Sequence, residues 1–406
     1  MAVGEYPFPI MHPVKGVKLT AVCGGIKKVN RRDVVLFELA EGSNVAGVFT
    51  KNAFCAAPVT VCREHLAAAS IRYLIINSGN ANACTGEQGL RDAKATCAAI
   101  AQLKNINETQ VLPFSTGVIG EPLPLTKITA VIPEALANLK ENGWDDAGAG
   151  IMTTDTRAKG FSEQFVFQGE TITVNGIAKG AGMIKPNMAT MLGYIATDAK
   201  ISQSLLQELA REAADKSFNR ITIDGDTSTN DSCILMATGQ VNLPEITQAS
   251  GELYEKLRAT ILAAHIHLAK SIVSDGEGAT KFVTVAVSGG KNRDECLAVG
   301  YAVAHSPLIK TALFASDPNW GRIVAAIGYA GVENLDAAKV RVHLNDVLIV
   351  ENGGRAASYT EAQGQTVMSG AEIGININLG RGDFAETIWT TDLSYEYVRI
   401  NADYRS

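Results

Sequence analysis

Residues 176–199 read GIAKGAGMIKPNMATMLGYIATDA, and the interpretation of this segment decides how the rest of the chain is understood. Gly180, Gly182 and Pro186 allow a tight backbone path. Apolar residues then surround Thr190. On this local pattern alone, the favoured interpretation is a loop that leads into a buried strand, with Thr190 as a packed β-branched residue, because short motifs often match by chance.

A second interpretation makes Thr190 a nucleophile that is created by internal cleavage. A threonine hydroxyl is a weak nucleophile unless a base takes its proton. Cleavage of the Ala189-Thr190 bond would give Thr190 its own α-amine, whose unperturbed pKa of about 7.7–8.0 suits a base within hydrogen-bond reach. The cleavage would use the same chemistry, because the hydroxyl would attack the Ala189 carbonyl and water would hydrolyse the resulting ester.

Acyl transfer also needs hydrogen-bond donors that face the oxyanion of the tetrahedral intermediate. The stretch PFSTGVIGEPLP (113–124) places Ser115, Thr116 and Gly117 on a predicted tight loop after an apolar segment. A glycine N–H and a threonine hydroxyl together suit this role. An ordinary Ser/Thr/Gly turn explains the same three residues.

Strand and helix patterns alternate along the chain. Residues 163–169 and 170–176 alternate like strands, and Asn175-Gly176 is the predicted hairpin turn. Residues 340–353 predict a second hairpin that turns at Asn345-Asp346. With no fixed repeat, the pattern predicts a layered α+β architecture with helices packed outside antiparallel sheets. The other predicted elements are strands at 72–77, 282–287 and 373–379 and helices at 89–105, 202–218, 254–273 and 293–306.

Composition indicates a globular chain. The 406 residues are 46% hydrophobic, which is enough to form a buried core. Only 19% are charged, whereas disordered chains combine low hydrophobicity with high charge. The net charge of −6 argues against a nucleic-acid partner. The first residues lack a signal-peptide pattern, and the apolar runs are too short to span a bilayer. We therefore expect a soluble, cytoplasmic protein without a membrane partner.

No metal site is expected. The seven cysteines are scattered without a CxxC pair, which favours reduced thiols over disulfides or zinc. His265 and His267 face different sides of their predicted helix. The stretch 224–231, DGDTSTND, resembles a calcium loop, but Thr229 and Leu235 stand where an EF-hand loop needs its sixth-position glycine and twelfth-position glutamate. We expect its aspartates to brace a turn near the active site instead.

Nine sequence blocks, taken in order, resemble the ornithine acetyltransferase (glutamate N-acetyltransferase) family over nearly the whole chain. Any one block is weak, but nine in the same order are highly specific. The blocks are AGVFTKN (46–52), NSGNANACTGE (77–87), STGVIGE (115–121), MTTDT (152–156), KGAGMIKPNMATML (179–192), ITIDGDTSTND (221–231), SDGEGATKF (274–282), KTALFASDPNWGRI (310–323) and WTTDLSYEYVRINADY (389–404).

The resemblance implies a fold and a processed chain. The fold would be a layered α/β/β/α sandwich of antiparallel sheets flanked by helices, of the N-terminal-nucleophile type. Cleavage between Ala189 and Thr190 would give an α chain of residues 1–189 and a β chain of residues 190–406. The family suggests a heterotetramer of two α and two β chains.

The resemblance also implies the reaction and the residues that carry it. Acetyl would pass from N2-acetyl-L-ornithine to L-glutamate through an acetyl-Thr190 intermediate. Some members also accept acetyl-CoA as donor, and no other cofactor is implied. Thr116 and Gly117 match the oxyanion hole. The positions that match substrate-binding residues are Thr153, Lys179, Thr190, Glu277, Asn401 and Ser406.

These residue types suit the substrates. Lys179 can pair with a substrate carboxylate, and Glu277 with the ornithine ammonium. Asn401 and Ser406, as neutral hydrogen-bonding groups, tolerate either charge. Without the family match, a solvated Lys179 and a frayed C-terminus would be favoured. Two alternatives remain open: an amidase or aminopeptidase that uses the same threonine with water as acceptor, and an uncleaved amino-acid-binding protein.

Overall fold

The computed structural model describes residues 3–4, 6–27, 29–185 and 191–403. The chain forms two compact units. We call Tyr6–Asn219 with Thr227–Ile272 the N-terminal unit, and Met1–Glu5, Arg220–Asp226 and Val273–Ser406 the C-terminal unit. Three predicted site residues, Ala189, Thr190 and Ser406, lie outside the described residues.

Two sheets form the centre of the N-terminal unit. The strand order is β1-β2-β4-β5 in the first, here called the N-terminal sheet, and β3-β9-β8-β7-β6 in the second, the central sheet. The N-terminal sheet consists of β1 (Val17–Val22), β2 (Val34–Leu39), β4 (Tyr73–Asn80) and β5 (Val111–Val118). The central sheet consists of β3 (Asn44–Phe49), β6 (Lys159–Phe167), β7 (Glu170–Lys179), β8 (Leu192–Thr197) and β9 (Ser232–Ala237).

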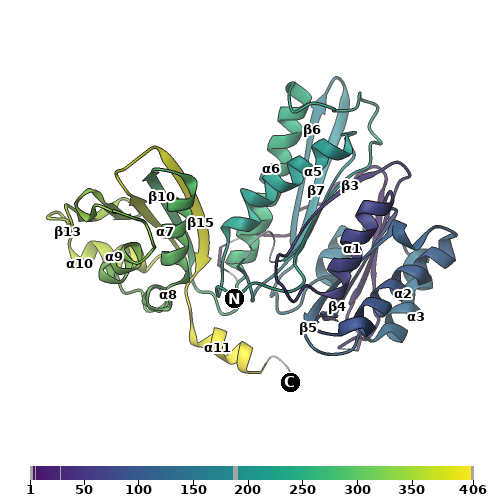
Figure 1. Cartoon of the computed structure of the whole chain (residues 1–406), viewed down its shortest axis with the longest axis horizontal. Coiled ribbons are helices and arrows are strands. Elements are labelled where there is room, and N and C mark those ends of the chain that lie inside the picture. The colour runs from purple at the N-terminus through teal and green to yellow at the C-terminus, as the bar shows by residue number, and fades with distance from the viewer. Residues whose placement is uncertain (1–2, 5, 28, 186–190, 404–406) are drawn as a thin grey trace. The chain divides into compact units, whose positions relative to one another are not determined.

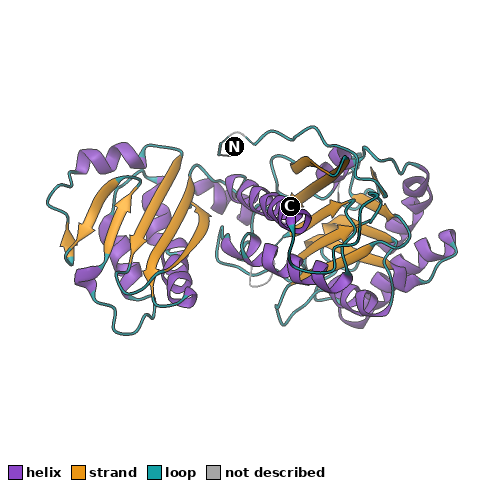
Figure 2. Ribbon diagram, turned by 90° about the horizontal axis from the view of Figure 1, so that it is seen from above, coloured by secondary structure: helices purple, strands orange, loops and turns teal. Residues whose placement is uncertain are grey.

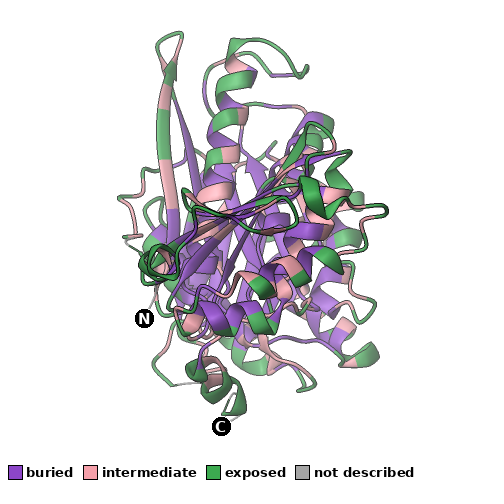
Figure 3. Ribbon diagram, turned by 90° about the vertical axis from the view of Figure 1, so that its left-hand side faces the viewer, coloured by how far each residue is buried: buried purple, intermediate pink, exposed green. Residues whose placement is uncertain are grey.

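Helices cover the outer faces of these two sheets (Figure 1). Phe37, Phe114 and Tyr194 belong to the core that the inner faces of the two sheets share. A second core joins the outer face of the N-terminal sheet, at Ile75, to Ile132 of a covering helix. Buried residues are concentrated in the strands, and the helices carry exposed residues on their outer sides (Figure 3). The helices of the unit, including α1 and α4, which also contribute residues to the shared core, are α1 (Ala57–Ala68), α2 (Gly86–Lys104), η1 (Glu108–Gln110), α3 (Leu125–Ala137), α4 (Trp144–Gly150), α5 (Gln203–Asp215), η2 (Phe218–Arg220) and α6 (Glu252–Ser274).

The α/β/β/α layering that the family resemblance implies is therefore confirmed in this unit, but its sheets are mixed. β4 pairs in parallel with β5, and β8 in parallel with β9, whereas the other pairs are antiparallel. A parallel pair needs a crossover connection. Helix α2 supplies it between β4 and β5, and α5 lies in the connection between β8 and β9.

The predicted hairpin turn at Asn175-Gly176 is wrong. The β6–β7 hairpin turns at Gln168 and Gly169, which both have positive φ, as a two-residue hairpin requires. Asn175 and Gly176 lie inside β7. A Cβ on Gly176 would lie 2.8 Å from Leu268 of α6. This glycine therefore makes room for a helix that is distant in sequence rather than for a turn.

The C-terminal unit contains a six-stranded sheet with the order β13-β12-β11-β14-β10-β15 (Figure 2). Val285, Val299 and Ile375 belong to its core. The hairpin predicted at Asn345-Asp346 is confirmed, because Leu344 pairs with Val347. The elements are β10 (Phe282–Gly290), α7 (Arg293–His305), α8 (Pro307–Phe314), α9 (Trp320–Gly328), η3 (Ala337–Lys339), β11 (Arg341–Leu344), β12 (Val347–Glu351), β13 (Gly354–Arg355), α10 (Glu361–Met368), β14 (Glu372–Asn378), β15 (Phe384–Thr391) and α11 (Tyr395–Ala402).

In the described part of the chain, no single helix has the length and apolarity of a membrane span, although α7 and α8 together, as a bent pair, meet that test by length and composition.

Candidate active site

The described residues on both sides of the predicted cleavage site lie at one point of the central sheet. Lys179, the last residue of β7, pairs with Leu192, the first residue of β8. The carbonyl of Met191 accepts a hydrogen bond from the Ser232 N–H at 2.9 Å. The connection that contains Ala189 and Thr190 therefore begins and ends beside the same strand pair.

Thr116 and Gly117, the predicted oxyanion residues, lie in β5 itself and not on a separate loop, which corrects the sequence expectation. They pair with Ser78 and Gly79 of the parallel strand β4. Gly117 has a φ of +136°, and a Cβ at this position would lie 2.3 Å from the carbonyl carbon of Gly79. Only glycine fits this close approach of two backbones.

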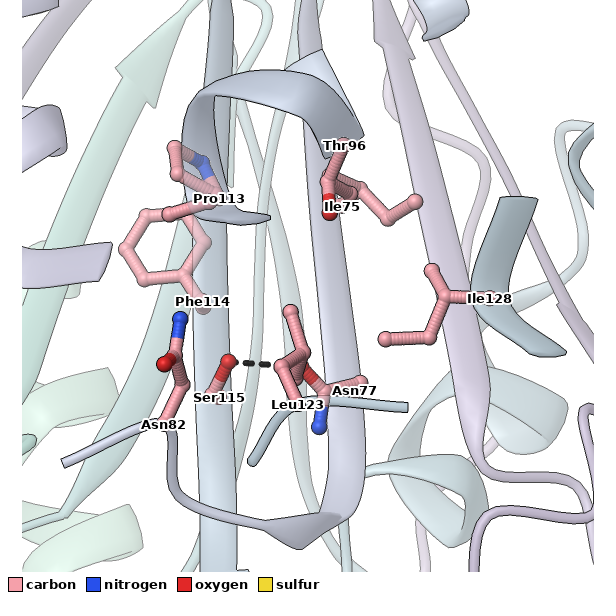
Figure 4. Close-up of a pocket in the computed structure, with 10 residues that line it drawn as sticks. Ile75, Asn77, Asn82, Thr96, Pro113, Phe114, Ser115, Leu123 and Ile128 are labelled. Atoms are coloured by element: carbon pink, nitrogen blue, oxygen red, sulfur yellow. Dashed lines mark hydrogen bonds between the residues drawn. The ribbon is translucent and has the colours of Figure 1, made fainter. Parts of the chain in front are cut away.

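Buried polar side chains fix the strand just before Thr116. The hydroxyl of Ser115 donates to Asn77 Oδ1 at 2.6 Å (Figure 4). A cavity of about 10 Å³ lies beside this pair, which is room for about one water molecule. The residues that line the cavity are Ile75, Asn77, Asn82, Ala93, Thr96, Pro113, Phe114, Ser115, Leu123 and Ile128.

Asn230 forms hydrogen bonds to two segments of the site, at Ala81 and at Ser115. Its Nδ2 donates to the carbonyl of Ala81 at 2.6 Å and to the carbonyl of Ser115 at 2.8 Å. The residues before it also bind distant motifs, because Thr227 Oγ1 donates to Lys185 O at 2.9 Å. The sequence expectation singled out the three aspartates of the 221–231 block and missed Asn230. Of those, Asp231 belongs to the N-terminal unit, whereas Asp224 and Asp226 belong to the C-terminal unit.

Asp155, which sequence reasoning also missed, is fully buried and binds three parts of the site. Its Oδ2 accepts the backbone N–H of Thr153 at 2.9 Å. Its Oδ1 accepts the N–H of Gly180 at 2.7 Å and the ammonium of Lys159 at 2.6 Å. Burial raises the pKa of Asp155, but the Lys159 and Lys179 cations and these hydrogen bonds outweigh burial and hold that pKa well below its usual range.

Lys179 reaches the predicted oxyanion residues. Its ammonium donates to Thr116 Oγ1 at 3.2 Å. Together with Asp155, this contact joins Thr116, Thr153 and Lys179 in one network within the N-terminal unit. Three residues that the sequence placed in one site are therefore brought together.

Two other predicted substrate-binding residues meet in the C-terminal unit. Asn401 of α11 donates from Nδ2 to Glu277 Oε2 at 2.7 Å. The hydroxyl of Ser394 donates to the carbonyl of Gly278 at 2.6 Å. Gly278 has a φ of +68°, and a Cβ there would lie 2.5 Å from the backbone nitrogen of Tyr397. A glycine at this position therefore lets α11 approach the loop that carries Glu277.

Asp392 binds the residues that follow this loop, and Lys310 binds Thr391, the residue before Asp392. Asp392 Oδ1 accepts the N–H groups of Thr280 at 2.8 Å and Lys281 at 2.9 Å. The buried ammonium of Lys310 donates to the carbonyl and the hydroxyl of Thr391, next to Asp392. Burial lowers the pKa of Lys310 to about 8, although Asp392 and Asp224 act in the opposite direction. Neither role has a local sign in the sequence, because both depend on contacts between segments that are distant in the chain.

Among the described residues, no cluster of three or more His, Cys, Asp or Glu side chains is arranged to hold a metal ion.

The layered mixed sheets and their covering helices define an α+β fold, and comparison with known proteins identifies the protein as an acyltransferase. The model of the ArgJ family matches residues 18–406. The arginine biosynthesis bifunctional proteins ArgJ of Pseudomonas syringae pv. tomato and Pseudomonas fluorescens are each 62% identical over 406 residues, which is all of this chain and all of each relative. The chain belongs to the ArgJ family and is an acyltransferase of arginine biosynthesis, so the resemblance found in the sequence is confirmed.

A solved structure agrees with this assignment. The arginine biosynthesis bifunctional protein ArgJ of Bacillus halodurans is 36% identical with a TM-score of 0.50. The match covers 52% of this chain and 99% of the solved chain. The solved chain is therefore roughly half as long as this one.

Proposed function

We propose that this enzyme transfers acetyl from N2-acetyl-L-ornithine to L-glutamate, giving L-ornithine and N-acetyl-L-glutamate by a ping-pong mechanism. The observation that carries the proposal is the network of Thr116, Thr153, Lys179 and Asp155. In this network Lys179, at the strand pair where the connection with Thr190 begins and ends, contacts Thr116, which supports an oxyanion role for Thr116.

Processing would create the nucleophile. The Thr190 hydroxyl attacks the Ala189 carbonyl carbon, the peptide nitrogen leaves as the α-amine of Thr190, and water hydrolyses the ester. The free amine then takes the hydroxyl proton when Thr190 attacks the acetyl carbonyl. The Thr116 hydroxyl and the Gly117 N–H donate to the oxyanion, ornithine leaves with the proton, and the amine of glutamate attacks the acetyl-Thr190 ester.

The charges in the two units suit the charges of the substrates. Lys179 would bind the carboxylate that both amino acids carry, with Thr153 beside it. Glu277, oriented by Asn401, would bind the ornithine ammonium. Ser406 would complete this site as a neutral hydrogen-bonding group.

The central sheet supports an assembly of α and β chains. β3, β6 and β7 would belong to the α chain of residues 1–189, and β8 and β9 to the β chain of residues 190–406. Pairing of β7 with β8 would hold the two chains together after cleavage. The half-length solved chain from Bacillus halodurans agrees with processing into such chains. We further propose a heterotetramer of two α and two β chains in the cytoplasm.

The proposed reaction needs neither a metal nor a cofactor, and no nucleic-acid or membrane partner. A second activity, acetylation of glutamate from acetyl-CoA, would use the same acetyl-Thr190 intermediate. The name "bifunctional" of the Pseudomonas relatives supports this second activity.

Intact mass measurement with N-terminal sequencing tests the proposal. We expect two fragments, one of which begins Thr-Met-Leu-Gly. Exchange of labelled acetyl between acetylornithine and glutamate should then follow ping-pong kinetics. A single intact chain in active protein would overturn the mechanism, and hydrolysis of acetylornithine at a rate that ignores glutamate would favour an amidase.

A further inference from the structure

The contact between Lys179 and Thr116 has a defined direction. An ammonium group has three donors and no acceptor, so Thr116 Oγ1 must accept the hydrogen bond from Lys179. The proton of the Thr116 hydroxyl then points away from Lys179. Within the described part of the chain this hydroxyl has no protein acceptor, although Thr116 is buried. The proton is therefore left to a group that enters the site.

Asp155 holds the backbone from which Lys179 reaches Thr116. Its Oδ1 binds the N–H of Gly180, the residue that follows Lys179. The same oxygen binds Lys159, which pairs with Ala178, the residue before Lys179. The buried carboxylate also attracts the Lys179 cation itself. Asp155 thus binds the residue after Lys179 directly, binds the strand partner of the residue before it, and attracts the Lys179 cation.

We propose that Lys179 and Asp155 are positioning residues that orient the Thr116 hydroxyl, so that its proton is presented to the oxyanion in both self-cleavage and acetyl transfer. A hydroxyl that already accepts from a cation is a more polarised donor. Lys179 would therefore act on the chemical step and not only on the substrate carboxylate. This inference rests on the proposed function of Thr116 and Thr190.

Self-cleavage separates the two roles of Lys179, because the Ala189-Thr190 bond carries no substrate carboxylate. The variants Lys179→Met and Thr116→Val should each slow cleavage of freshly made chain. For Thr116→Val, which removes an oxyanion donor, we expect cleavage to slow by roughly 10²–10³-fold. The double variant should cleave no more slowly than Thr116→Val alone. Lys179→Arg, which keeps a cationic donor, should recover part of the rate.

Asp155→Asn has a matched control in the same unit. Asp198 is also a buried aspartate that accepts backbone N–H groups, from Thr173 at 2.9 Å and Lys15 at 3.4 Å, and it follows the far end of β8. We expect Asp155→Asn and the control Asp198→Asn both to melt at a lower temperature than the parent enzyme. Only Asp155→Asn should slow cleavage. If the two cleave at equal rates, the role assigned to Asp155 is overturned.

A neutral acetyl donor supplies a second measurement for variants that still cleave slowly. p-Nitrophenyl acetate has neither a carboxylate nor an ammonium group. Lys179→Met should lower kcat for this ester as well as for acetylornithine. If Lys179→Met cleaves and turns over the ester like the parent enzyme while KM for acetylornithine rises, Lys179 only binds substrate and this inference fails alone. An intact, inactive parent chain would overturn the proposed function and the inference together.

Discussion

Asn230 donates to the backbone carbonyl of Ser115 at 2.8 Å, and the same amide nitrogen donates to Ala81 at 2.6 Å. Ser115 directly precedes the proposed oxyanion donors, and Asn230 lies just before β9, which begins at Ser232, in the proposed β chain. The geometry of Thr116 and Gly117 therefore depends on a residue from the other side of the cleavage site.

Replacement of Asn230 by alanine should destabilise the N-terminal unit and slow self-cleavage. The variant leaves two carbonyls without their donor, at about 1–3 kcal/mol for each buried group left unpaired. Asn175→Ala is the matched control, because Asn175 is buried in β7 and its Nδ2 donates to His12 O at 2.6 Å. Denaturant unfolding and the cleavage time course should show similar stability losses but slow cleavage only for Asn230→Ala. Equal cleavage rates would reduce Asn230 to a structural role.

Alanine substitutions at two glycines with positive φ distinguish the cost of backbone strain from the cost of steric overlap. Gly117→Ala would place a Cβ 2.3 Å from the backbone of Gly79, so we expect a loss of about 3 kcal/mol or more and no processing. Gly120 has a φ of +84° but open space around its Cβ position. Gly120→Ala should therefore cost only the backbone strain of about 1 kcal/mol. Thermal melting and gel analysis of cleavage compare the pair, and a cleaved, stable Gly117→Ala enzyme would contradict the close approach of β4 and β5.

The sequence predicted elements whose signals are local. The apolar periodicity of 89–105 and the alternation of 340–353 correspond to α2 and to the β11–β12 hairpin. The turn predicted at Asn175-Gly176 failed because the space around Gly176 is set by Leu268, far along the chain. The parallel strand pairs were missed for the same reason, since a crossover is a property of the whole topology.

Some residues of the candidate site could likewise be predicted from the sequence, and others could not. Thr116, Thr153, Lys179, Glu277 and Asn401 could be named because they stand in recognisable blocks. Asp155, Asn230 and Lys310 stand in the same kind of blocks, but nothing in their neighbours indicates a role. Their importance comes from burial and from hydrogen bonds to distant segments, which only the fold supplies.

Substitution of the proposed nucleophile should separate cleavage from folding. Thr190→Ala removes the hydroxyl, so we expect an intact, inactive chain. Thr190→Ser keeps a hydroxyl and should retain part of both cleavage and transfer. Mass spectrometry and an acetyl-exchange assay measure both properties. A serine variant that is uncleaved and fully inactive would count against a simple nucleophile role, and an alanine variant with normal turnover would exclude it.

Removal of the negative charge of Glu277 should weaken binding of the ornithine side without affecting processing. Glu277→Gln keeps the size and the contact with Asn401 but loses attraction for the ammonium, so we expect KM for acetylornithine to rise about tenfold. Self-cleavage involves no ornithine and should proceed normally. Glu396→Gln, on the exposed surface of α11, is the control and should leave KM unchanged. A normal KM for Glu277→Gln would place the ammonium elsewhere.

The buried Lys310 should make the C-terminal unit more stable at alkaline pH. Its folded pKa of about 8 lies below the ordinary 10.5, so between these pH values the unfolded chain binds the extra proton. The resulting penalty is complete below pH 8 and disappears as the pH rises through 10.5, a change of about 3 kcal/mol. Lys310→Met cannot show this change. Unfolding curves from pH 7.5 to 10.5 should therefore show the parent enzyme gaining stability relative to the variant, and parallel pH profiles would mean that Lys310 titrates alike in the folded and unfolded chain.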